Sequence, residues 1–332
     1  MRTLSLAAAF LLASGANAAD APRSLPVGAC INMGNHLEAQ SETAHGGVRI
    51  EAADFKRIRA AGFTTVRVPV RWSNKTGKGP DYTIDPKWMA RVTTVVDQAL
   101  AAGLKVILND HHFDALDADP AANSAKLAAM WAQIAPHFAD RPTSRLWFEI
   151  ENEPHDKLTN AILMETLAPA LKAIRASNPD RPVVIGGDFW SGIDSLATLE
   201  LPDDSNVYPT FHYYEPFDFT HQGAGWVKPK PPALGRVYGS AEDAERLVKD
   251  TAKIRAYVAR TGLIPFMGET GAYDAHIPLA QRVQYTRAVH DAFTPLGVGI
   301  CAWAYTNTFP YYDHKAKRWL PGLRSAAGLP ED

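Results

Sequence analysis

Short apolar segments of strand character alternate with longer segments of helical spacing along almost the whole chain, and this alternation most constrains the fold. Strands that are joined by helical crossovers pair in parallel and are covered by helices on their faces. Eight strands are predicted, at 27–33, 64–68, 105–108, 146–150, 182–185, 206–211, 264–267 and 298–302. Helical spacing falls between them, at 52–61, 88–102, 125–138, 159–177, 242–260 and 279–293.

The number of strands favours a closed barrel over an open sheet. Eight parallel strands close a (β/α)8 barrel, and 332 residues are enough for one barrel with extended loops. An open doubly wound sheet would normally carry a glycine-rich phosphate turn after its first strand, and the segment 28–32 (GACIN) is not such a turn. The predicted fold class is therefore α/β, a single TIM barrel with its active site at the carboxyl ends of the strands.

The first eighteen residues have the features of a secretory signal peptide. They combine a positive start at Met1-Arg2, an apolar run at 4–12 and a small-x-small cleavage site at 16–18. The apolar run is too short to span a bilayer as a helix, although an uncleaved N-terminal anchor is the alternative interpretation. We expect a signal peptide at 1–18, one catalytic barrel domain at 19–332, and export to the periplasm or the extracellular space.

The charge balance indicates which partners the chain does not attract. Lys and Arg number 34 against 36 Asp and Glu, a net charge of −2, so no strong positive field recruits nucleic acid or an anionic membrane. No later segment approaches the ~18 uninterrupted apolar residues of a transmembrane helix. We expect a neutral or weakly charged partner, and neither nucleic acid nor membrane.

Polar and aromatic side chains stand at the ends of most of the predicted strands. In a barrel these ends form one rim, where catalytic residues lie, whereas polar groups inside strands are normally avoided. We therefore expect the side chains of this rim to lie together. They are Arg67, Asp110, His111, His112, Glu151, Asn152, Glu153, His212, Tyr213, Tyr214, Glu269 and Trp303.

Two of these residues, Glu153 and Glu269, supply the pair of carboxyl groups that glycoside hydrolysis requires. One must stay protonated to donate to the leaving oxygen, and the other must stay ionised to attack the anomeric carbon. Arg67 can hold a nucleophile ionised, and burial among aromatic rings can raise the pKa of an acid. Either glutamate alone is better explained as a salt bridge at the barrel mouth, but their joint placement favours catalysis.

The segment 146–155 (LWFEIENEPH) resembles the signature of glycoside hydrolase family 5, which includes many cellulases. The resemblance extends over nearly the whole of the predicted domain. It includes 62–69 (GFTTVRVP), 106–112 (VILNDHH), 211–214 (FHYY), 267–271 (MGETG) and 302–305 (AWAY). It implies a retaining reaction, with the two carboxyl groups separated by ~5 Å.

Carried over position by position, the resemblance implies that Glu153 is the acid/base and Glu269 the nucleophile. The implied substrate-binding residues are Arg67, which orients the nucleophile, His111, Asn152 against the sugar 2-hydroxyl, His212 and Tyr214 beside the nucleophile, and Trp303 as a floor under the sugar. The implied chemistry needs no cofactor.

The third predicted strand departs from the pattern of the family, because Asp110 precedes the histidine pair. We take His111 as the site residue, and His112 is the alternative. A metal site is a second interpretation of this region, but it has neither the His-x-His nor the His-Glu-x-x-His spacing, so no metal is expected. The residues that would form it are Asp110, His111, His112, Asp114, Asp117 and Asp119.

Other residues on the strand-end side have two interpretations each. Asn35 and Glu38 either reach a bound sugar or cap a loop. Flat aromatic side chains suit the apolar faces of pyranose rings, although each one alone is better explained by packing. These side chains are Trp72, Trp190, Trp226, Phe309, Tyr311 and Tyr312. Glu149 and Glu151 are interpreted as structural.

Cys30 and Cys301 lie on the first and last predicted strands, which a closed barrel makes neighbours. An oxidising compartment permits a disulfide between them. A bond between adjacent strands is geometrically demanding, however, and small buried cysteines are common in cores. We favour two core-filling thiols and keep the disulfide as the alternative.

Taken together, the sequence predicts an exported endo-β-1,4-glucanase. The choice of glucan rests on the segment 215–223 (EPFDFTHQG), which resembles the cellulase members of the family more than its mannanases. The same mechanism on mannan, mixed-linkage glucan or a β-glucoside is the nearest alternative. A non-catalytic glycan-binding barrel and a metal-dependent barrel hydrolase are the others.

Overall fold

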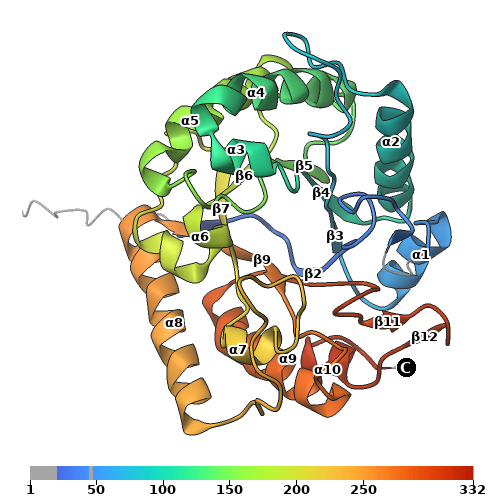
Figure 1. Ribbon diagram of the computed structural model, residues 1–332, viewed down its shortest axis with the longest axis vertical. Helices are drawn as coiled ribbons and strands as arrows, with labels where there is room; N and C mark the ends of the chain where they lie inside the picture. The colour runs from blue at the N-terminus through green and yellow to red at the C-terminus, as the bar shows by residue number, and fades with distance from the viewer. Residues whose placement is uncertain (1–20, 45–47, 332) are drawn as a thin grey trace, which may run out of the picture.

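The computed structural model describes residues 21–44 and 48–331, so the predicted signal peptide lies outside the described residues. Eight parallel strands close into a barrel in the order β10-β2-β3-β4-β5-β6-β7-β9, surrounded by helices (Figure 1). The predicted (β/α)8 barrel is confirmed. The strands are β2 (Ala29–Asn32), β3 (Thr65–Val68), β4 (Lys105–Asn109), β5 (Leu146–Glu149), β6 (Val183–Gly186), β7 (Val207–His212), β9 (Phe266–Thr270) and β10 (Ile300–Ala302).

The six predicted helices are present, within a few residues of their expected ends. Two of them begin earlier than expected, because an aspartate caps the first turn and a proline follows it. Asp85 accepts a hydrogen bond from the Lys87 amide, and Asp119 accepts one from the Ala122 amide. The long helices are α1 (Ala52–Ala60), α2 (Pro86–Ala101), α4 (Pro120–His137), α5 (Asn160–Ser177), α8 (Ala241–Thr261) and α9 (Leu279–Phe293).

The seventh predicted strand, 264–267, has the wrong boundaries. Leu263–Ile264 (β8) pairs instead with Arg23–Ser24 (β1) in a separate two-stranded sheet, and the barrel strand begins at Phe266. Pro265 stands between them and has no N–H to donate, so the ladder is interrupted there.

The connection from β6 to β7 has two short turns in place of a long helix, α6 (Asp188–Ser191) and η2 (Ile193–Ala197). Phe189, Trp190 and Ser191 all have left-handed backbone angles, with φ of 52°, 57° and 53°. Non-glycine residues rarely adopt this conformation, so the turn depends on its surroundings.

Alternation along β5 divides the core into two layers. Trp147 points into the barrel and is buried with Cys30, Ile107 and Val184. Phe148 points outward and packs against Trp131 of α4, with ring centroids 5.3 Å apart. The same alternation brings Glu149 to the inside, one layer above Trp147.

Cys30 and Cys301 form a disulfide, so the expectation of two separate thiols is wrong. The parallel register of β2 and β10 places the two residues directly opposite each other, with Cα atoms 4.2 Å apart. The first and last strands of the barrel are thereby covalently joined.

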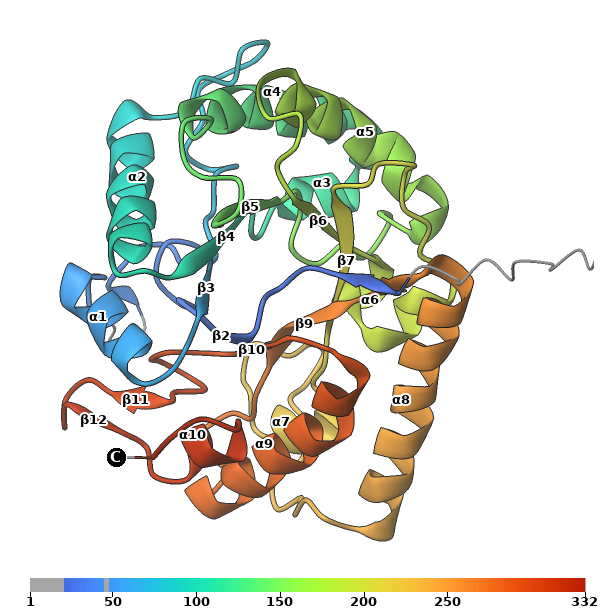
Figure 2. The same ribbon diagram turned by 180° about the vertical axis from the view of Figure 1, so that it is seen from behind.

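The carboxyl end of the chain packs back onto the first helix. The hairpin of β11 (Tyr312–Asp313) and β12 (Arg318–Trp319) lies beside α1 and α10 (Leu323–Ala326) in both views (Figures 1 and 2). The Arg57 guanidinium of α1 lies 4.6 Å from the centre of the Tyr312 ring. Within the described ranges, none of the helices is long and apolar enough to cross a bilayer.

Candidate active site

The buried guanidinium of Arg67 on β3 is the centre of the site. It forms two hydrogen bonds to Glu149, of 2.7 and 2.8 Å, and one of 2.8 Å to Oε1 of Glu269. It also donates to Asn32, at 2.9 Å, and to Asn152. Buried charges are costly unless they are paired and hydrogen-bonded, and here every side of the guanidinium is occupied. The hydrogen bond from this fully paired guanidinium therefore fixes the orientation of the Glu269 carboxyl group.

Glu149 and Asn32 have structural parts in this arrangement. Glu149 is fully buried and binds the Arg67 fork with both oxygens. Asn32 is absent from the predicted site residues, yet its amide donates to the Gly268 and Ala302 carbonyls as well as accepting from Arg67. The signal that would identify Asn32 is a polar residue at the end of the first apolar strand.

The two predicted catalytic carboxyl groups meet around His212. Its Nδ1 lies 2.7 Å from Oε1 of Glu153 and 3.7 Å from Oε2 of Glu269. An oxygen of each glutamate and a nitrogen of the imidazole all lie within 4.8 Å of one another. The hydroxyl of Tyr214 donates to Oε2 of Glu269 at 2.9 Å. Strands β5, β7 and β9 thus bring these four side chains to one point.

The two glutamates differ in their surroundings. Burial raises the pKa of Glu153 to about 7, against the opposing charges of Arg67 and His155. Burial also raises the pKa of Glu269, but His212, Arg67 and the Tyr214 hydrogen bond lower it. The Glu153 side chain keeps 24% of its surface exposed, and that of Glu269 keeps 6%. These surroundings favour a protonated carboxyl group at Glu153, the more exposed of the two glutamates.

His212 is uncharged at neutral pH, because burial lowers its pKa to about 4. Its Nε2 atom is buried without a hydrogen-bond partner and faces Gly268. A Cβ atom at position 268 would lie 2.9 Å from this nitrogen and 2.9 Å from Oγ1 of Thr210. A glycine next to Glu269 therefore leaves room for the imidazole between the two carboxyl groups.

Trp303 and His111 form an aromatic wall of the same site. Their rings are stacked, with centroids 5.8 Å apart and planes 9° from parallel. His111 is buried and its Nδ1 lies 3.1 Å from the Asn109 amide nitrogen. His112, the alternative site residue, has left-handed φ of 60° and meets the His111 ring edge-on. The structure thus places His111 against the predicted sugar floor and His112 on its outer side.

Glu38 lies closer to the site than the sequence indicates. It is buried, and its carboxyl group accepts hydrogen bonds from the backbone amides of Asn35 and His36. Burial raises its pKa to about 7, and the charge of Glu269 acts in the same direction. The side-chain amide of Asn35 donates a hydrogen bond to the Thr308 hydroxyl at 2.9 Å.

The aromatic residues of the strand-end loops separate into two groups. Trp190 and Trp226 are exposed, by 52% and 50%, and Trp190 stacks on His155 with ring centroids 4.9 Å apart. The others are buried and belong to the packing. They are Trp72, Phe309, Tyr311 and Tyr312.

The residues of the alternative metal site do not converge. Asp119 caps α4, Asp117 accepts from the His155 amide, and Asp110 accepts from the Trp72 amide. Within residues 21–44 and 48–331, one group of three possible ligands lies close enough to share an ion. It is formed by Glu153, His212 and Glu269, the same side chains that form the centre of the predicted catalytic site.

The sequence of residues 32–308 matches the family model described as cellulase (glycosyl hydrolase family 5). The chain belongs to glycoside hydrolase family 5. Among curated relatives of this family 5 chain, endoglucanase H of Acetivibrio thermocellus is 34% identical over 272 residues, which cover 82% of this chain and 29% of the relative. The cellulase/esterase CelE of the same organism is 31% identical over 299 residues, 84% of this chain and 35% of the relative. The chain thus spans about a third of the length of these relatives.

Solved structures cover the family 5 chain more completely. Endoglucanase Cel5A from Thermotoga maritima superposes with a TM-score of 0.86 and 37% identity, over 91% of this chain and 97% of the neighbour. The cellulose synthase subunit Z from Clostridioides difficile has a TM-score of 0.85 and 30% identity, over 91% of this chain and 99% of the neighbour.

Proposed function

We propose that the protein is an exported, retaining endo-β-1,4-glucanase that hydrolyses β-glucan with Glu153 as acid/base and Glu269 as nucleophile. One observation carries this proposal: both carboxyl groups contact the same neutral imidazole, while only Glu269 of the two also accepts hydrogen bonds from Arg67 and Tyr214. This asymmetry suits one protonated and one ionised carboxyl group at the same pH.

In the first step, Glu269 attacks the anomeric carbon and the bond to the leaving oxygen breaks. Glu153 gives its proton to that oxygen, and the sugar becomes esterified to Glu269. Both hydrogen bonds to Glu269, from Arg67 and from Tyr214, stabilise the ionised carboxylate before the attack. Burial and the charge of Glu269 raise the pKa of Tyr214, so its hydroxyl stays protonated and can donate.

In the second step, Glu153 acts as a base. It takes a proton from a water molecule, whose oxygen attacks the anomeric carbon and releases Glu269. Two inversions give net retention, and this requires carboxyl groups that lie ~5–5.5 Å apart rather than the ~6.5–9.5 Å of inverting enzymes. The grouping of their oxygens with His212 within 4.8 Å supports the shorter separation.

The substrate is proposed from relatives and from one segment. The curated relatives of the chain are named endoglucanases, and the segment 215–223 resembles that of cellulases. Mannan is a second candidate, because Cel5A from Thermotoga maritima has been crystallised with mannotriose as well as with cellobiose. Export is supported by the features of residues 1–18 and by the Cys30–Cys301 disulfide, which fits an oxidising compartment.

The test is hydrolysis of cellotetraose and mannotetraose by the purified protein, with the anomeric configuration of the first product followed by NMR. We expect cleavage of cellotetraose with retention, and loss of cleavage in Glu269→Gln. Absence of turnover on every β-linked oligosaccharide would leave a non-catalytic glycan-binding barrel, and inversion would exclude the double displacement.

A further inference from the structure

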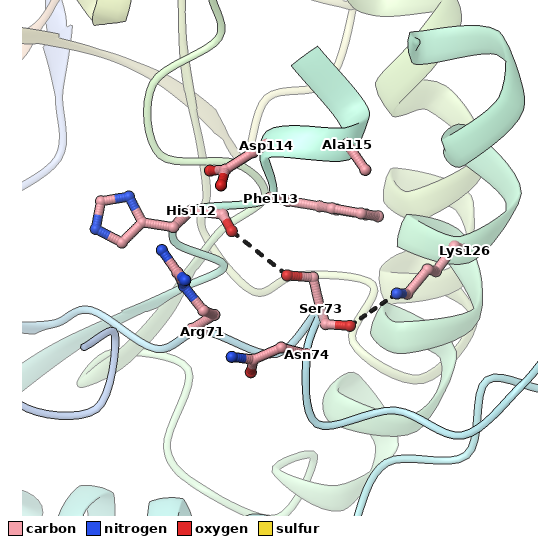
Figure 3. Close-up of a pocket in the computed structure, with 8 residues that line it drawn as sticks. All are labelled: Arg71, Ser73, Asn74, His112, Phe113, Asp114, Ala115 and Lys126. Atoms are coloured by element: carbon pink, nitrogen blue, oxygen red, sulfur yellow. Dashed lines mark hydrogen bonds between the residues drawn. The ribbon is translucent and has the colours of Figure 1, made fainter. Parts of the chain in front are cut away.

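A pocket of about 220 Å³ opens on the strand-end side of the barrel, and Figure 3 shows the residues that line it. The loops after β3 and β4 supply Arg71, Ser73 and His112 to it, and α4 supplies Lys126. Pockets for drug-sized ligands are larger, about 300–1,000 Å³. This pocket therefore suits one small group rather than a length of glycan chain.

The pocket is connected to the predicted sugar floor through two ring contacts. Trp303 stacks on His111, and His111 meets the His112 ring edge-on at a centroid distance of 4.4 Å. His112 in turn lines the pocket, and its backbone oxygen accepts a 3.4 Å hydrogen bond from the Ser73 hydroxyl (Figure 3). The pocket and the predicted sugar floor are therefore separated by the His111 and His112 rings.

Arg71 brings an unpaired positive charge to this pocket. In the part of the chain that the structure describes, its guanidinium has no hydrogen-bond acceptor and no carboxylate within 4 Å. Its Nε atom is buried and has no partner. A buried donor without an acceptor is destabilising, so an acceptor from a ligand is favoured at this position.

Lys126 adds a second positive charge on the other side of Ser73. Its ammonium group donates to the Ser73 carbonyl at 2.7 Å and lies 5.2 Å from the centre of the Phe113 ring. Asp110, behind it, is buried with its pKa raised to about 8, so that carboxyl group is neutral at working pH. Among the lining residues, Asp114 is the acidic one (Figure 3).

We propose that this pocket binds a carboxylate carried by the glycan, so that a β-glucan bearing a uronic acid unit is a preferred substrate. The proposal rests on the proposed glycanase function. The planar fork of arginine matches the two oxygens of a carboxylate, and charge-assisted hydrogen bonds of this kind are among the strongest in proteins. The net charge of −2 for the whole chain does not oppose it, because two cations against one carboxylate set the local charge.

The test compares kcat/KM for cellotetraose with kcat/KM for tetrasaccharides of the same linkage that carry glucuronic acid at the non-reducing or at the reducing end. We define the acid preference as the acidic-to-neutral ratio of kcat/KM. This ratio cancels any general loss of activity in a variant. We expect Arg71→Gln to lower the acid preference of one of the two acidic substrates by about tenfold or more.

Three further variants sharpen the comparison. Arg71→Lys keeps the charge but not the fork, so we expect an intermediate acid preference. Lys126→Gln should lower it and Asp114→Asn should raise it. The matched control is Lys249→Gln on α8, where the side chain is 75% exposed and pairs with exposed Glu245, so the acid preference should not change.

The outcomes separate the two proposals. Cleavage of cellotetraose with an acid preference that neither Arg71→Gln nor Lys126→Gln changes would overturn the carboxylate pocket and leave the glucanase intact. Failure to cleave any of the tetrasaccharides would overturn the glucanase itself. If Arg71→Gln does not fold, Lys126→Gln and Asp114→Asn still test the carboxylate pocket. The first should lower the acid preference and the second should raise it, and an unchanged acid preference in both would overturn the pocket.

Discussion

The imidazole of His212 lies between Glu153 and Glu269, 2.7 Å from one carboxyl group and 3.7 Å from the other. Because burial keeps this ring neutral, it can supply a single N–H to the pair without adding a positive charge that would ionise both. The difference between the proposed acid and the proposed nucleophile then depends on Arg67 and Tyr214, which bind Glu269 but not Glu153. The predictions below test this asymmetry and the contacts that support it.

Glu153→Gln should separate the two steps of the reaction. The variant has no proton to give, so kcat on cellotetraose should fall by at least about 10³-fold. With a dinitrophenyl cellobioside the leaving group needs no proton, so the glycosyl-enzyme should form and accumulate, giving a burst of dinitrophenol. Added azide, which needs no base, should restore turnover. A variant that loses the burst as well would indicate that Glu153 is not the acid/base.

The pH profile should have limbs that belong to the two glutamates. Activity requires protonated Glu153, so kcat/KM should fall as the pH rises through about 7. It also requires ionised Glu269, so activity should fall on the acid side, at a pKa above the ordinary glutamate value. Tyr214→Phe removes a hydrogen bond that stabilises the ionised form, which should move the acid limb to higher pH. An acid limb that does not move in Tyr214→Phe would contradict this assignment.

Glu149→Gln should be strongly destabilising although the residue takes no part in the chemistry. The substitution leaves the buried Arg67 with one carboxylate instead of two, and breaking a buried ion pair costs about 3–5 kcal/mol. Urea unfolding measures the loss. Glu245→Gln is the matched control, because its partner Lys249 lies at 3.8 Å on the exposed face of α8 and such pairs contribute about 0–1 kcal/mol. Equal effects of the two variants would contradict the buried network.

Reduction of the disulfide should lower the free energy of unfolding by about 2–5 kcal/mol, because the bond closes a loop with a sequence separation of 271. Thermal unfolding with and without dithiothreitol measures the difference. The Cys30→Ala, Cys301→Ala double variant should unfold at the same temperature in both conditions. A wild-type protein that is insensitive to reductant and has two reactive thiols would contradict the bond.

Much of the barrel can be predicted from the sequence, because each strand is a short apolar run and the long segments between the strands have helical spacing. The split between β8 and β9 cannot be read from apolarity alone, since Pro265 interrupts a continuous apolar run. The left-handed turn at Phe189–Ser191 opposes local propensity and depends on tertiary contacts. The disulfide depends on the register across the closing seam, which no local pattern specifies.

For the site, the ends of the predicted strands indicate which side chains lie together, but not which contacts each of them makes. Extending the alternation of the predicted strand 146–150 to the residues that follow it puts Glu149, Glu151 and Glu153 on one side. Only the structure shows Glu149 under Arg67 and Glu153 against His212. The positive φ of His112 separates two adjacent histidines that the sequence cannot tell apart. It sends one ring to the sugar floor and the other to the pocket of Arg71.

The bond between the first and last strands also bears on how the protein survives cleavage of its backbone. Every peptide bond between Cys30 and Cys301 lies inside one covalent ring. A protease that cuts an exposed loop, such as 228–237 after α7 (Phe217–Thr220), opens the ring but does not release a fragment. The strand that carries Arg67 and the strand that carries Glu269 would then remain tethered, so a single nick need not separate the two halves of the catalytic centre.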